Sequence, residues 1–245
     1  MVACLGLIFG SFFATVIHRI PRGESPVAPP SRCPHCGMRL GPVDLVPLFS
    51  YVALRGRCRH CRNPISPRYP VVEALTAGIA YGLYATHFGT RDFWPYASLA
   101  SVLIVVSFID LEHMYIPDAV LLAGVLLWGA ASAPNGSAVL HKGAAGAVLG
   151  FGTMFAIYLL ARGGMGLGDV KLAALIGLYL GPAMTLLAVV LGFIAGSIAG
   201  LSLVLARRKA LKDRIPFAPF LALGAVAAML WGRQLLGWYF LTVIF

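Results

Sequence analysis

Acidic side chains are scarce in this sequence: 245 residues include only nine aspartates and glutamates, against 19 lysines and arginines. Charged residues make up 11% of the chain, whereas hydrophobic residues make up 59%. A soluble domain of this length would need far more polar surface. The apolar runs are roughly 17–25 residues long, which is the length that crosses a ~30 Å hydrocarbon core. The composition therefore excludes an ordinary soluble protein and predicts an all-α integral membrane protein.

Eight apolar runs account for most of the sequence, and we expect each to cross the membrane as a helix. They are Val2–Ile17, Val71–His87, Phe93–Ile109, Ala119–Ala133, Gly143–Ala161, Val170–Leu180, Ala183–Leu205 and Phe217–Tyr239. Arg19 and Arg22 follow the first run, which is the flank order of a retained anchor and not of a cleaved signal peptide. We expect three parts: a first transmembrane helix at 1–18, a small cytoplasmic loop domain at 19–69 and a multi-span membrane domain at 70–245.

Lysine and arginine fall almost entirely on one side of this arrangement. With eight spans, 16 of the 19 share the side of residues 19–69, including a cluster at 207–214. The positive-inside rule places that side, and with it the ends of the third and fifth spans, in the cytoplasm. The net charge of +10 then reflects orientation and attraction to the anionic headgroups of a lipid bilayer. Aromatic residues do not alternate with basic ones as in nucleic-acid-binding modules, so no nucleic-acid partner is expected.

Cysteine is concentrated in the 19–69 loop, where four of the five cysteines form two CxxC motifs separated by 21 residues. They are Cys33, Cys36, Cys58 and Cys61. This spacing predicts a four-thiolate zinc site, with Gly37 permitting the tight turn after the first motif. The loop has too little apolar content to fold alone, so metal binding would supply its folding free energy. The alternatives are two disulfides, which a reducing cytoplasm disfavours, or four free thiols. His35 and His60 could compete as ligands, but four sulfurs already complete the shell.

Asp110 ends the third apolar run, where an ionisable group beside the bilayer core is costly unless the protein uses it. Pro117 blocks helix continuation, and Asp118 is expected to cap the helix that follows, which gives Asp118 a structural explanation. Glu112 and His113 are expected in the connecting turn as a solvated interfacial pair. Asp110 has no comparable structural explanation and is a candidate functional residue.

Asp169 ends the glycine-rich turn Gly164-Met165-Gly166-Leu167-Gly168-Asp169, which begins at the end of the fifth span. The glycines remove side-chain bulk, so another backbone could approach closely. Asp169 is expected at a helix N-terminus, where the helix dipole favours the ionised carboxylate. Lys171 adds positive potential nearby. Gly166, Gly168 and Lys171 are therefore candidates for shaping the site.

Asp110 and Asp169 are expected on the same, cytoplasmic face of the membrane. Two carboxylates brought close together cannot both ionise freely, so the pair shares one proton. An aspartic protease uses such a pair: the ionised carboxylate takes a proton from water, and the protonated one polarises the scissile carbonyl. We therefore predict that Asp110 and Asp169 are catalytic. A glycine-rich turn that ends in one aspartate would be weak evidence for a protease site. The second aspartate on the same face makes the evidence more specific.

Motifs spread along nearly the whole chain resemble those of the bacterial prepilin peptidases, a family of type IV leader peptidases that are GxGD-type aspartic proteases. The motifs are Gly10-Ser11-Phe12, the two CxxC pairs, Asp44-Leu45-Val46-Pro47, Ile65–Pro70 with Glu73, the Asp110 segment, Gly164–Leu172 and Ile215–Phe220. The Gly-x-Gly-Asp-x-Lys turn and the cysteine tetrad are the most specific of these.

The resemblance implies more than the spacing shows. It implies a multi-pass protein of the bacterial inner membrane that serves type IV pili or type II secretion. It further implies that prepilins or pseudopilins lose a basic leader on the cytoplasmic side, with Asp110 and Asp169 as the two catalytic aspartates. Relatives with the tetracysteine loop usually also methylate the new N-terminus from S-adenosylmethionine. That cofactor rests on the resemblance alone, because no Rossmann glycine fingerprint follows a strand and no binding residues can be assigned.

Two functions of other classes compete with this interpretation. An ion-coupled membrane transporter would also place acids near the membrane, but it predicts an internal repeat with acids near mid-span. No convincing repeat is present, and both aspartates lie at run ends. A non-catalytic zinc-bearing scaffold for a secretion machine is the second alternative. Replacing either aspartate would leave such a scaffold working and would silence a protease.

Overall fold

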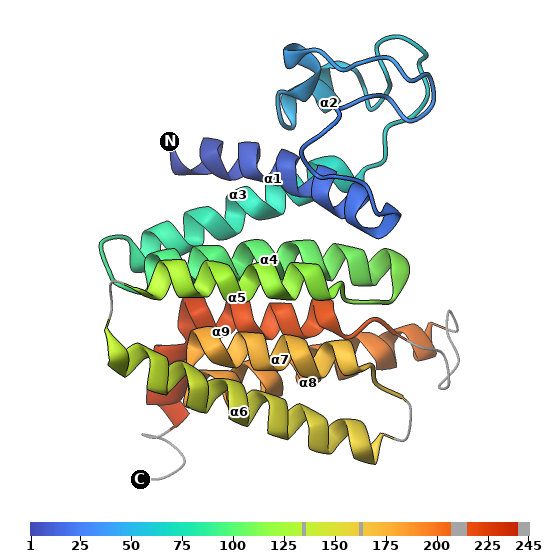
Figure 1. Cartoon of the computed structure of the whole chain (residues 1–245). Helices are drawn as coiled ribbons and strands as arrows, with labels where there is room; N and C mark the ends of the chain where they lie inside the picture. Colours follow the sequence, from blue (N-terminus) through green and yellow to red (C-terminus); the bar gives the residue numbers. More distant parts are fainter. Residues whose placement is uncertain (134–135, 162–163, 207–214, 240–245) are drawn as a thin grey trace. The chain divides into compact units, whose positions relative to one another are not determined.

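The structure is a computed structural model that describes residues 1–133, 136–161, 164–206 and 215–239, and in these residues it contains helices but no strand (Figure 1). The α-helices are α1 (Val2–Arg19), α2 (Phe49–Ala53), α3 (Arg68–His87), α4 (Phe93–His113), α5 (Asp118–Ser132), α6 (Ser137–Leu160), α7 (Leu167–Leu180), α8 (Pro182–Leu205) and α9 (Ala218–Tyr239). Short 3-10 helices cover Ile20–Arg22 and Pro42–Leu45. Arg162 and the basic cluster at 207–214, both used to predict orientation, lie outside the described residues.

The all-helical fold predicted from composition is confirmed. Among the described residues, five helices are long and apolar enough to cross a membrane: α1 with the turn that follows it, α4, α6, α8 and α9. The predicted runs at 71–87, 119–133 and 170–180 also form helices, but α5 and α7 have only 15 and 14 residues. The structure therefore supports a multi-span helical protein, and the count of eight spans stays a prediction.

The chain divides into two compact units, an N-terminal unit of residues 1–85 and a C-terminal unit of residues 86–245. The N-terminal unit holds α1, the cysteine-bearing loop and nearly all of α3. The C-terminal unit holds α4 to α9. The division of the loop 19–69 from its flanking helices, predicted from the sequence, stays a prediction.

Small residues set the packing of α1 on α3 within the N-terminal unit. Gly6 and Gly10 lie four residues apart on one face of α1, the spacing that lets membrane helices approach closely. A Cβ added at Gly6 would lie 2.7 Å from the Cα of Ala77, and one at Gly10 would lie 2.6 Å from the Cα of Glu73. Neither position has room for a side chain, so the two glycines hold the backbones of α1 and α3 in contact.

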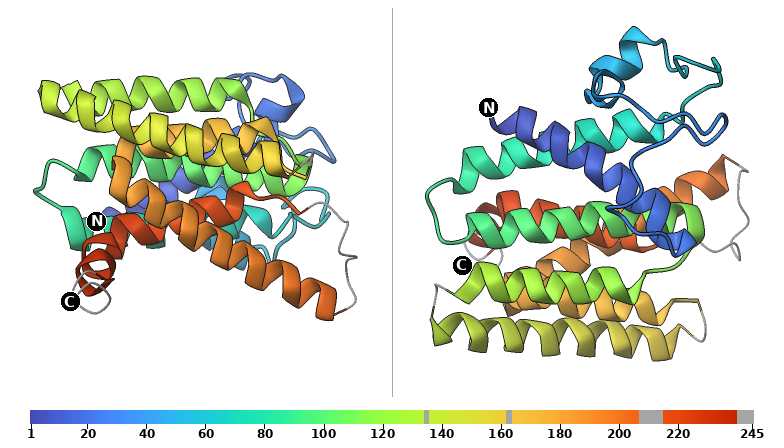
Figure 2. Two further views of the ribbon diagram at one scale, coloured as in Figure 1. Left: turned by 90° about the horizontal axis from the view of Figure 1, so that it is seen from below. Right: turned by 45° about the horizontal axis from the view of Figure 1, so that its top comes forward.

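Close contact between helices at glycines recurs in the C-terminal unit, where α6 packs along α7 and α8 packs along α9 (Figure 2). A Cβ added at Gly146 of α6 would collide with the carbonyl oxygen of Gly177 of α7, and one at Gly177 would collide with the Gly146 carbonyl. A Cβ at Gly224 of α9 would collide with the carbonyl of Ala188. The first of these contacts holds α7, which carries Asp169, against α6, and the second holds α9 against α8.

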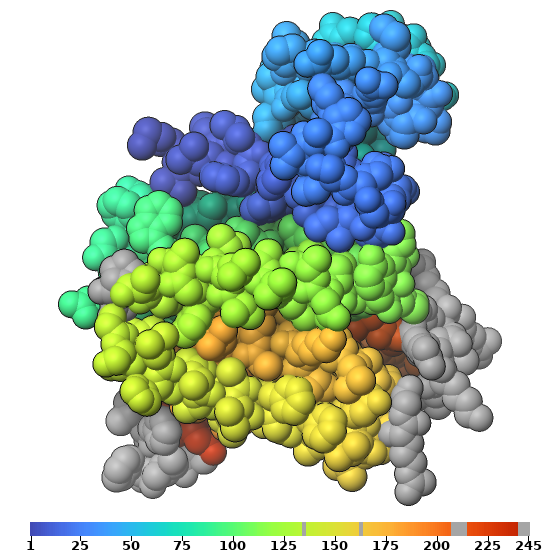
Figure 3. Space-filling model, in the orientation of Figure 1, coloured from blue at the N-terminus to red at the C-terminus, as the bar shows by residue number. Residues whose placement is uncertain are grey.

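The outer faces of this bundle are apolar. Leu160 of α6 and Leu205 of α8 are 81% and 75% exposed, and Val148 is 73% exposed. Figure 3 shows the side chains of α5 and α6 covering one such face of the C-terminal unit. Exposed apolar surface of this extent marks a surface that another phase or molecule covers, and for helices of this composition a bilayer is the fitting one.

Candidate active site and metal centre

Asp110 lies in the last turn of α4, not at its end. The helix continues to His113 and stops at Met114, which takes a left-handed conformation with φ 54°. The expectation that Glu112 and His113 form the connecting turn is therefore wrong, although both side chains are exposed, as predicted. Asp118 was expected to cap α5. It is instead the first residue of that helix, and Pro117 occupies the capping position without a side-chain capping bond.

The Asp110 carboxylate is buried, with 6% of its residue surface exposed. Its Oδ2 accepts a hydrogen bond of 3.1 Å from the backbone N–H of Ala218, the first residue of α9. That N–H has no partner within its own helix, because the first N–H groups of any helix lack one. The start of α9 therefore stabilises a negative charge when Asp110 is ionised, and it fixes the orientation of the carboxyl group.

Asp169 lies in the first turn of α7, as predicted, and is also buried, with 8% exposed. Gly166 caps this helix in an extended conformation, and its backbone N–H faces the Asp169 carboxylate. Each aspartate is thus directed at the N-terminal end of a helix, Asp110 at α9 and Asp169 at α7. This arrangement satisfies two carboxylates that would otherwise be buried without polar partners.

The structure brings the two aspartates together. Helix α4 contacts α7, and both contact α9. The carboxylates are close enough for Asp110 to repel a negative charge on Asp169. Two buried, interacting carboxyl groups from segments 59 residues apart in the sequence are the arrangement that lets one proton be shared. Chemically, such a pair can activate water and polarise a carbonyl group.

In the described part of the chain, no second backbone lies against Gly166 or Gly168, so the close approach expected there stays a prediction. A Cβ added at Gly168 would meet the Ile116 side chain at 3.1 Å, and one at Gly166 would meet only the Asp169 carboxylate and its own chain. Lys171 points its charge at another partner, since its Nζ lies 2.7 Å from Oδ1 of Asp118. That ion pair connects the start of α5 to the first turns of α7.

The four loop cysteines gather at one point, as predicted. Their sulfur atoms all lie within 4.8 Å of one another, and those of Cys33 and Cys61 are 3.8 Å apart. A tetrahedral ion with Zn–S bonds of ~2.3 Å would separate its sulfurs by about 3.8 Å. Neither His35 nor His60 joins the cluster in the described part of the chain. The donor set of four thiols therefore fits zinc.

The two CxxC motifs have the same backbone geometry. The N–H of Gly37 donates to the Cys33 carbonyl at 2.9 Å, and the N–H of Arg62 donates to the Cys58 carbonyl at 3.0 Å. Both residues are left-handed, Gly37 with φ 69° and Arg62 with φ 60°. Glycine adopts positive φ at little cost, so the turn at Gly37 was predictable from the sequence. Arginine carries a Cβ that disfavours positive φ, so the matching turn at Arg62 was not. Each motif thus forms a turn that directs two sulfurs to one side.

Charge and hydrogen bonding reinforce the loop around the cysteines. Arg59 donates from Nε to Oδ1 of Asp44 at 2.8 Å, and this bond holds the pKa of the Asp44 carboxyl below its usual value. The backbone N–H groups of Cys61 and His60 face the Cys58 sulfur and lower the pKa of its thiol to about 6. Such donors favour the thiolate of Cys58, the form that binds a metal, whereas burial and the neighbouring thiols raise the pKa of Cys61 to about 11.

Comparison with known proteins agrees with the division of the chain into units of residues 1–85 and 86–245. Residues 4–88 match the bacterial peptidase A24 N-terminal domain, and residues 97–201 match the type IV leader peptidase family. A prepilin leader peptidase/N-methyltransferase of Bacillus subtilis is 35% identical over 240 residues, which cover 96% of this chain and 94% of that protein. This chain belongs to the type IV leader peptidase family. Proteins of the same description in Aeromonas hydrophila and Pseudomonas aeruginosa are each 34% identical and cover 98% and 94% of this chain. No solved structure matches it.

Family membership confirms the resemblance drawn from the motifs, and the structure gives a role to Ala218, which the sequence named only as part of the Ile215–Phe220 motif. Ala218 carries no reactive side chain, and it contributes to the site only through its backbone N–H. Pro219 does mark a helix start in the sequence, because proline is favoured in the first turn. Nothing in the sequence shows that this start lies against Asp110, 108 residues earlier.

Proposed function

We propose that this protein is a membrane-embedded aspartic endopeptidase that removes the leader peptide of prepilins or pseudopilins and methylates the new N-terminus. The observation that carries the peptidase is the pair of buried carboxyl groups, Asp110 and Asp169, each held at a helix N-terminus. Membership of the type IV leader peptidase family gives the reaction and the substrate class. The names of the relatives support the second activity, N-methylation.

Cleavage follows from the shared proton. The ionised member of the pair takes a proton from a water molecule, whose oxygen bonds to the scissile carbonyl carbon. The protonated member hydrogen-bonds the carbonyl oxygen as negative charge develops there. When the C–N bond breaks, the proton taken from water passes to the leaving amine. The N–H of Ala218 keeps the Asp110 carboxyl in one orientation throughout.

The dyad is tested by removing either titratable group. Asp110→Asn and Asp169→Asn should each abolish cleavage, because an amide neither accepts the water proton nor shares one. Glu112→Gln is the matched control: it removes an exposed carboxylate two residues from Asp110 and should have a mild effect. Purified variants would be incubated with a prepilin peptide and leader loss measured by mass spectrometry. Substantial cleavage by either asparagine variant, in protein that inserts normally, would exclude the assignment.

The loop domain would hold one structural Zn²⁺ through Cys33, Cys36, Cys58 and Cys61. The metal would supply folding free energy to a segment that has few buried apolar side chains of its own. Methylation would use S-adenosylmethionine, which supplies an electrophilic methyl group to the neutral N-terminal amine. The same incubation would show a gain of one methyl group on the cleaved product.

We place the protein in the bacterial inner membrane, with eight spans and the aspartates at the cytoplasmic face. Three things support this placement: five helices suited to crossing a membrane, the lysine and arginine count, and the family. A reporter fused at the loop containing Arg91 and another within 19–69 would test it. The proposal requires that only the second be cytoplasmic.

A further inference from the structure

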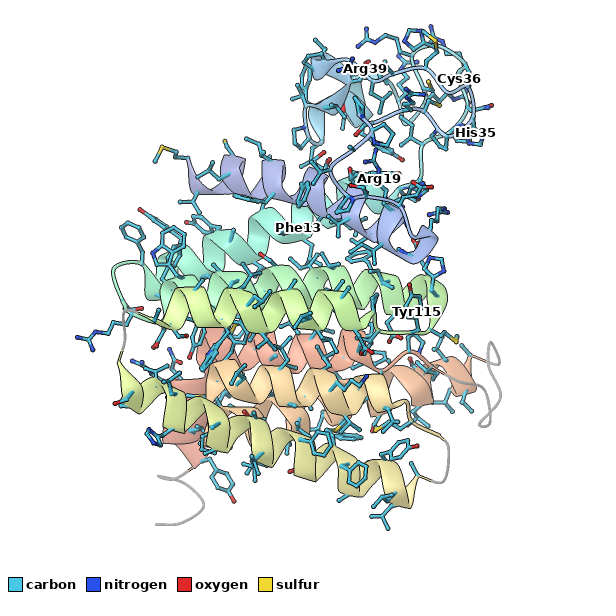
Figure 4. The ribbon with its side chains drawn as sticks, viewed as in Figure 1. Phe13, Arg19, His35, Cys36, Arg39 and Tyr115 are labelled. Carbon is cyan, nitrogen blue, oxygen red and sulfur yellow. The ribbon has the colours of Figure 1, made fainter. Side chains whose placement is uncertain are left out.

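The connection between α4 and α5 is short and begins close to Asp110. It consists of residues 114–117, and Figure 4 shows Tyr115 within it, at the end of α4. The N–H of Met114 donates to the carbonyl oxygen of Asp110 at 2.9 Å, so the connection is bonded to the backbone of that residue. Pro117 is buried, and its ring fixes φ. The connection therefore has little freedom to move independently of Asp110.

Ile116 of this connection packs directly on the start of α7. A Cβ added at Gly168 would lie 3.1 Å from the Cβ of Ile116 and 3.3 Å from its Cδ1, which is closer than ordinary van der Waals contact. Gly168 immediately precedes Asp169 in the sequence. One side-chain contact thus joins the segment that follows Asp110 to the residue that precedes Asp169.

This contact gives a physical reason for glycine at position 168. Gly168 lies in the first turn of α7 and does not have a positive φ, so its backbone conformation does not require glycine. Glycine also weakens a helix relative to alanine. The requirement is for space, because the three atoms nearest to an added Cβ all belong to Ile116. The glycine before Asp169 therefore lets Ile116 approach α7 closely.

An ion pair joins the same two segments at a second point. The Nζ of Lys171 lies 2.7 Å from Oδ1 of Asp118, which directly follows the connection. Both side chains are exposed, so the pair contributes little to stability. Its position matters more, because Lys171 lies two residues after Asp169. Two points of contact restrict rotation as well as translation between the segments that carry the aspartates.

We infer that the contact of Ile116 with Gly168, assisted by the ion pair of Asp118 and Lys171, sets the separation of the two proposed catalytic aspartates. This inference rests on the proposed peptidase function and gives Ile116 the role of a positioning residue. Two carboxyl groups share a proton and activate water only within a narrow range of separations, and a displacement of about 1 Å can lower a rate about 100-fold. A side chain that takes no part in proton transfer can therefore control its rate.

The test compares cleavage of a prepilin peptide by full-length variants in lipid nanodiscs. Gly168→Ala adds a methyl group against Ile116, and we expect it to lower kcat about tenfold while KM changes less than about twofold. Alanine is the better helix former, so a weaker α7 would not explain this loss. Gly152→Ala is the matched control: its added Cβ has no atom within 4 Å, and it should cleave as the wild type does.

The pH dependence of kcat gives a readout that a general loss of folding would not move. Repulsion between two carboxyl groups separates the pH values at which the pair gains and loses its shared proton, and this repulsion weakens with distance. The bell-shaped pH profile of Gly168→Ala should therefore be narrower than that of the wild type. The profile of Gly152→Ala should keep the wild-type width.

A second substitution tests whether the loss arises at the contact itself. Ile116→Ala removes the Cγ1 and Cδ1 atoms that lie against position 168. The double variant with Gly168→Ala and Ile116→Ala should therefore recover most of the kcat that Gly168→Ala loses, as expected of coupled neighbours. Lys171→Met should lower kcat only about threefold, because an exposed ion pair is weak, and Lys171→Arg should retain the rate.

The outcomes separate this inference from the proposed function. Recovery in the double variant supports the positioning contact. Wild-type kcat in Gly168→Ala overturns it, and so do losses that multiply in the double variant. If Gly168→Ala does not insert, the exposed position decides, and Lys171→Met with the kcat of the wild type overturns the inference. A wild-type protein that cleaves no prepilin peptide overturns the proposed function, and this inference with it.

Discussion

At the scale of single residues, the backbone N–H of Ala218 is as much a part of the site as the aspartate that it contacts. It donates to Asp110, and the Phe217 carbonyl accepts the first helical hydrogen bonds of α9, so Ala218 is the first position inside the helix. Proline is tolerated at that position because the N–H there has no helical partner. Ala218 therefore offers a way to delete one hydrogen bond without interrupting a helix.

We expect Ala218→Pro to reduce the rate of leader cleavage by about 10- to 100-fold, because a hydrogen bond to a charged group contributes about 1.5–3 kcal/mol. Ala218→Ser adds bulk at the same buried position and retains the N–H, so it controls for crowding. Both rates would be measured on a prepilin peptide at saturating concentration. Equal losses in the two variants would attribute the effect to packing and not to the hydrogen bond.

At the scale of helices, the contact between α6 and α7 depends on a pair of glycines. A Cβ at Gly177 would meet the backbone of Gly146 and Ala147 directly, whereas Gly152, on the same helix as Gly146, has no atom within 4 Å of an added Cβ. We expect Gly177→Ala to lower stability by about 1–3 kcal/mol, the usual cost of overpacking. Gly152→Ala should be neutral or slightly stabilising. Thermal unfolding of both variants in detergent would check this, and similar midpoints would show that the helices separate at little cost.

The length of α7 sets the depth of Asp169. Its 14 residues span ~21 Å at ~1.5 Å per residue, about 9 Å less than a ~30 Å hydrocarbon core. If the Gly181 turn lies at the outer face, Asp169 lies below the cytoplasmic edge of the core, where an irregular turn is tolerated only when protein packs around it. The substrate's apolar helix would then have to enter the bilayer beside the site.

Single cysteines at positions 112 and 169, in a Cys4→Ser background, would measure that depth. A membrane-impermeant thiol reagent applied from the cytoplasmic side should label position 112 quickly, because Glu112 is exposed, and position 169 slowly, because Asp169 is 8% exposed. The parent with only the zinc cysteines gives the background. Equal rates at the two positions would place Asp169 at the surface.

At the scale of the whole molecule, the two units divide the proposed activities. The aspartates lie in residues 86–245, whereas the four loop cysteines lie in residues 1–85. Serine at any of the four loop cysteines should lower bound zinc and make residues 19–69 sensitive to proteases, while Cys4→Ser should change neither. Cleavage should suffer less than methyl transfer, because aspartate chemistry needs no metal. Wild-type protein prepared without chelator and containing almost no zinc would contradict the site.

The sequence predicted the parts of this molecule that depend on local patterns. Apolar runs predicted where helices form, and the CxxC spacing predicted that four sulfurs converge. The ends of the helices were less predictable: α4 continues past Asp110 to His113 and ends there, where Met114 takes a left-handed conformation. Contacts between distant segments were not predictable, and they include Ala218 with Asp110 and Gly146 with Gly177. These depend on how helices pack, which no short stretch of sequence encodes.

The two cysteine turns differ in a way that bears on how the metal leaves. Gly37 accepts its left-handed backbone freely, whereas Arg62 does so at a cost of about 1–2 kcal/mol. With an ion bound by both turns, its coordination would offset that cost. Once the ion is removed, relaxation of the turn at Cys58 and Cys61 releases more free energy than relaxation of the turn at Cys33 and Cys36. Loss and uptake of the metal should therefore be ordered, with the second turn opening first and closing last.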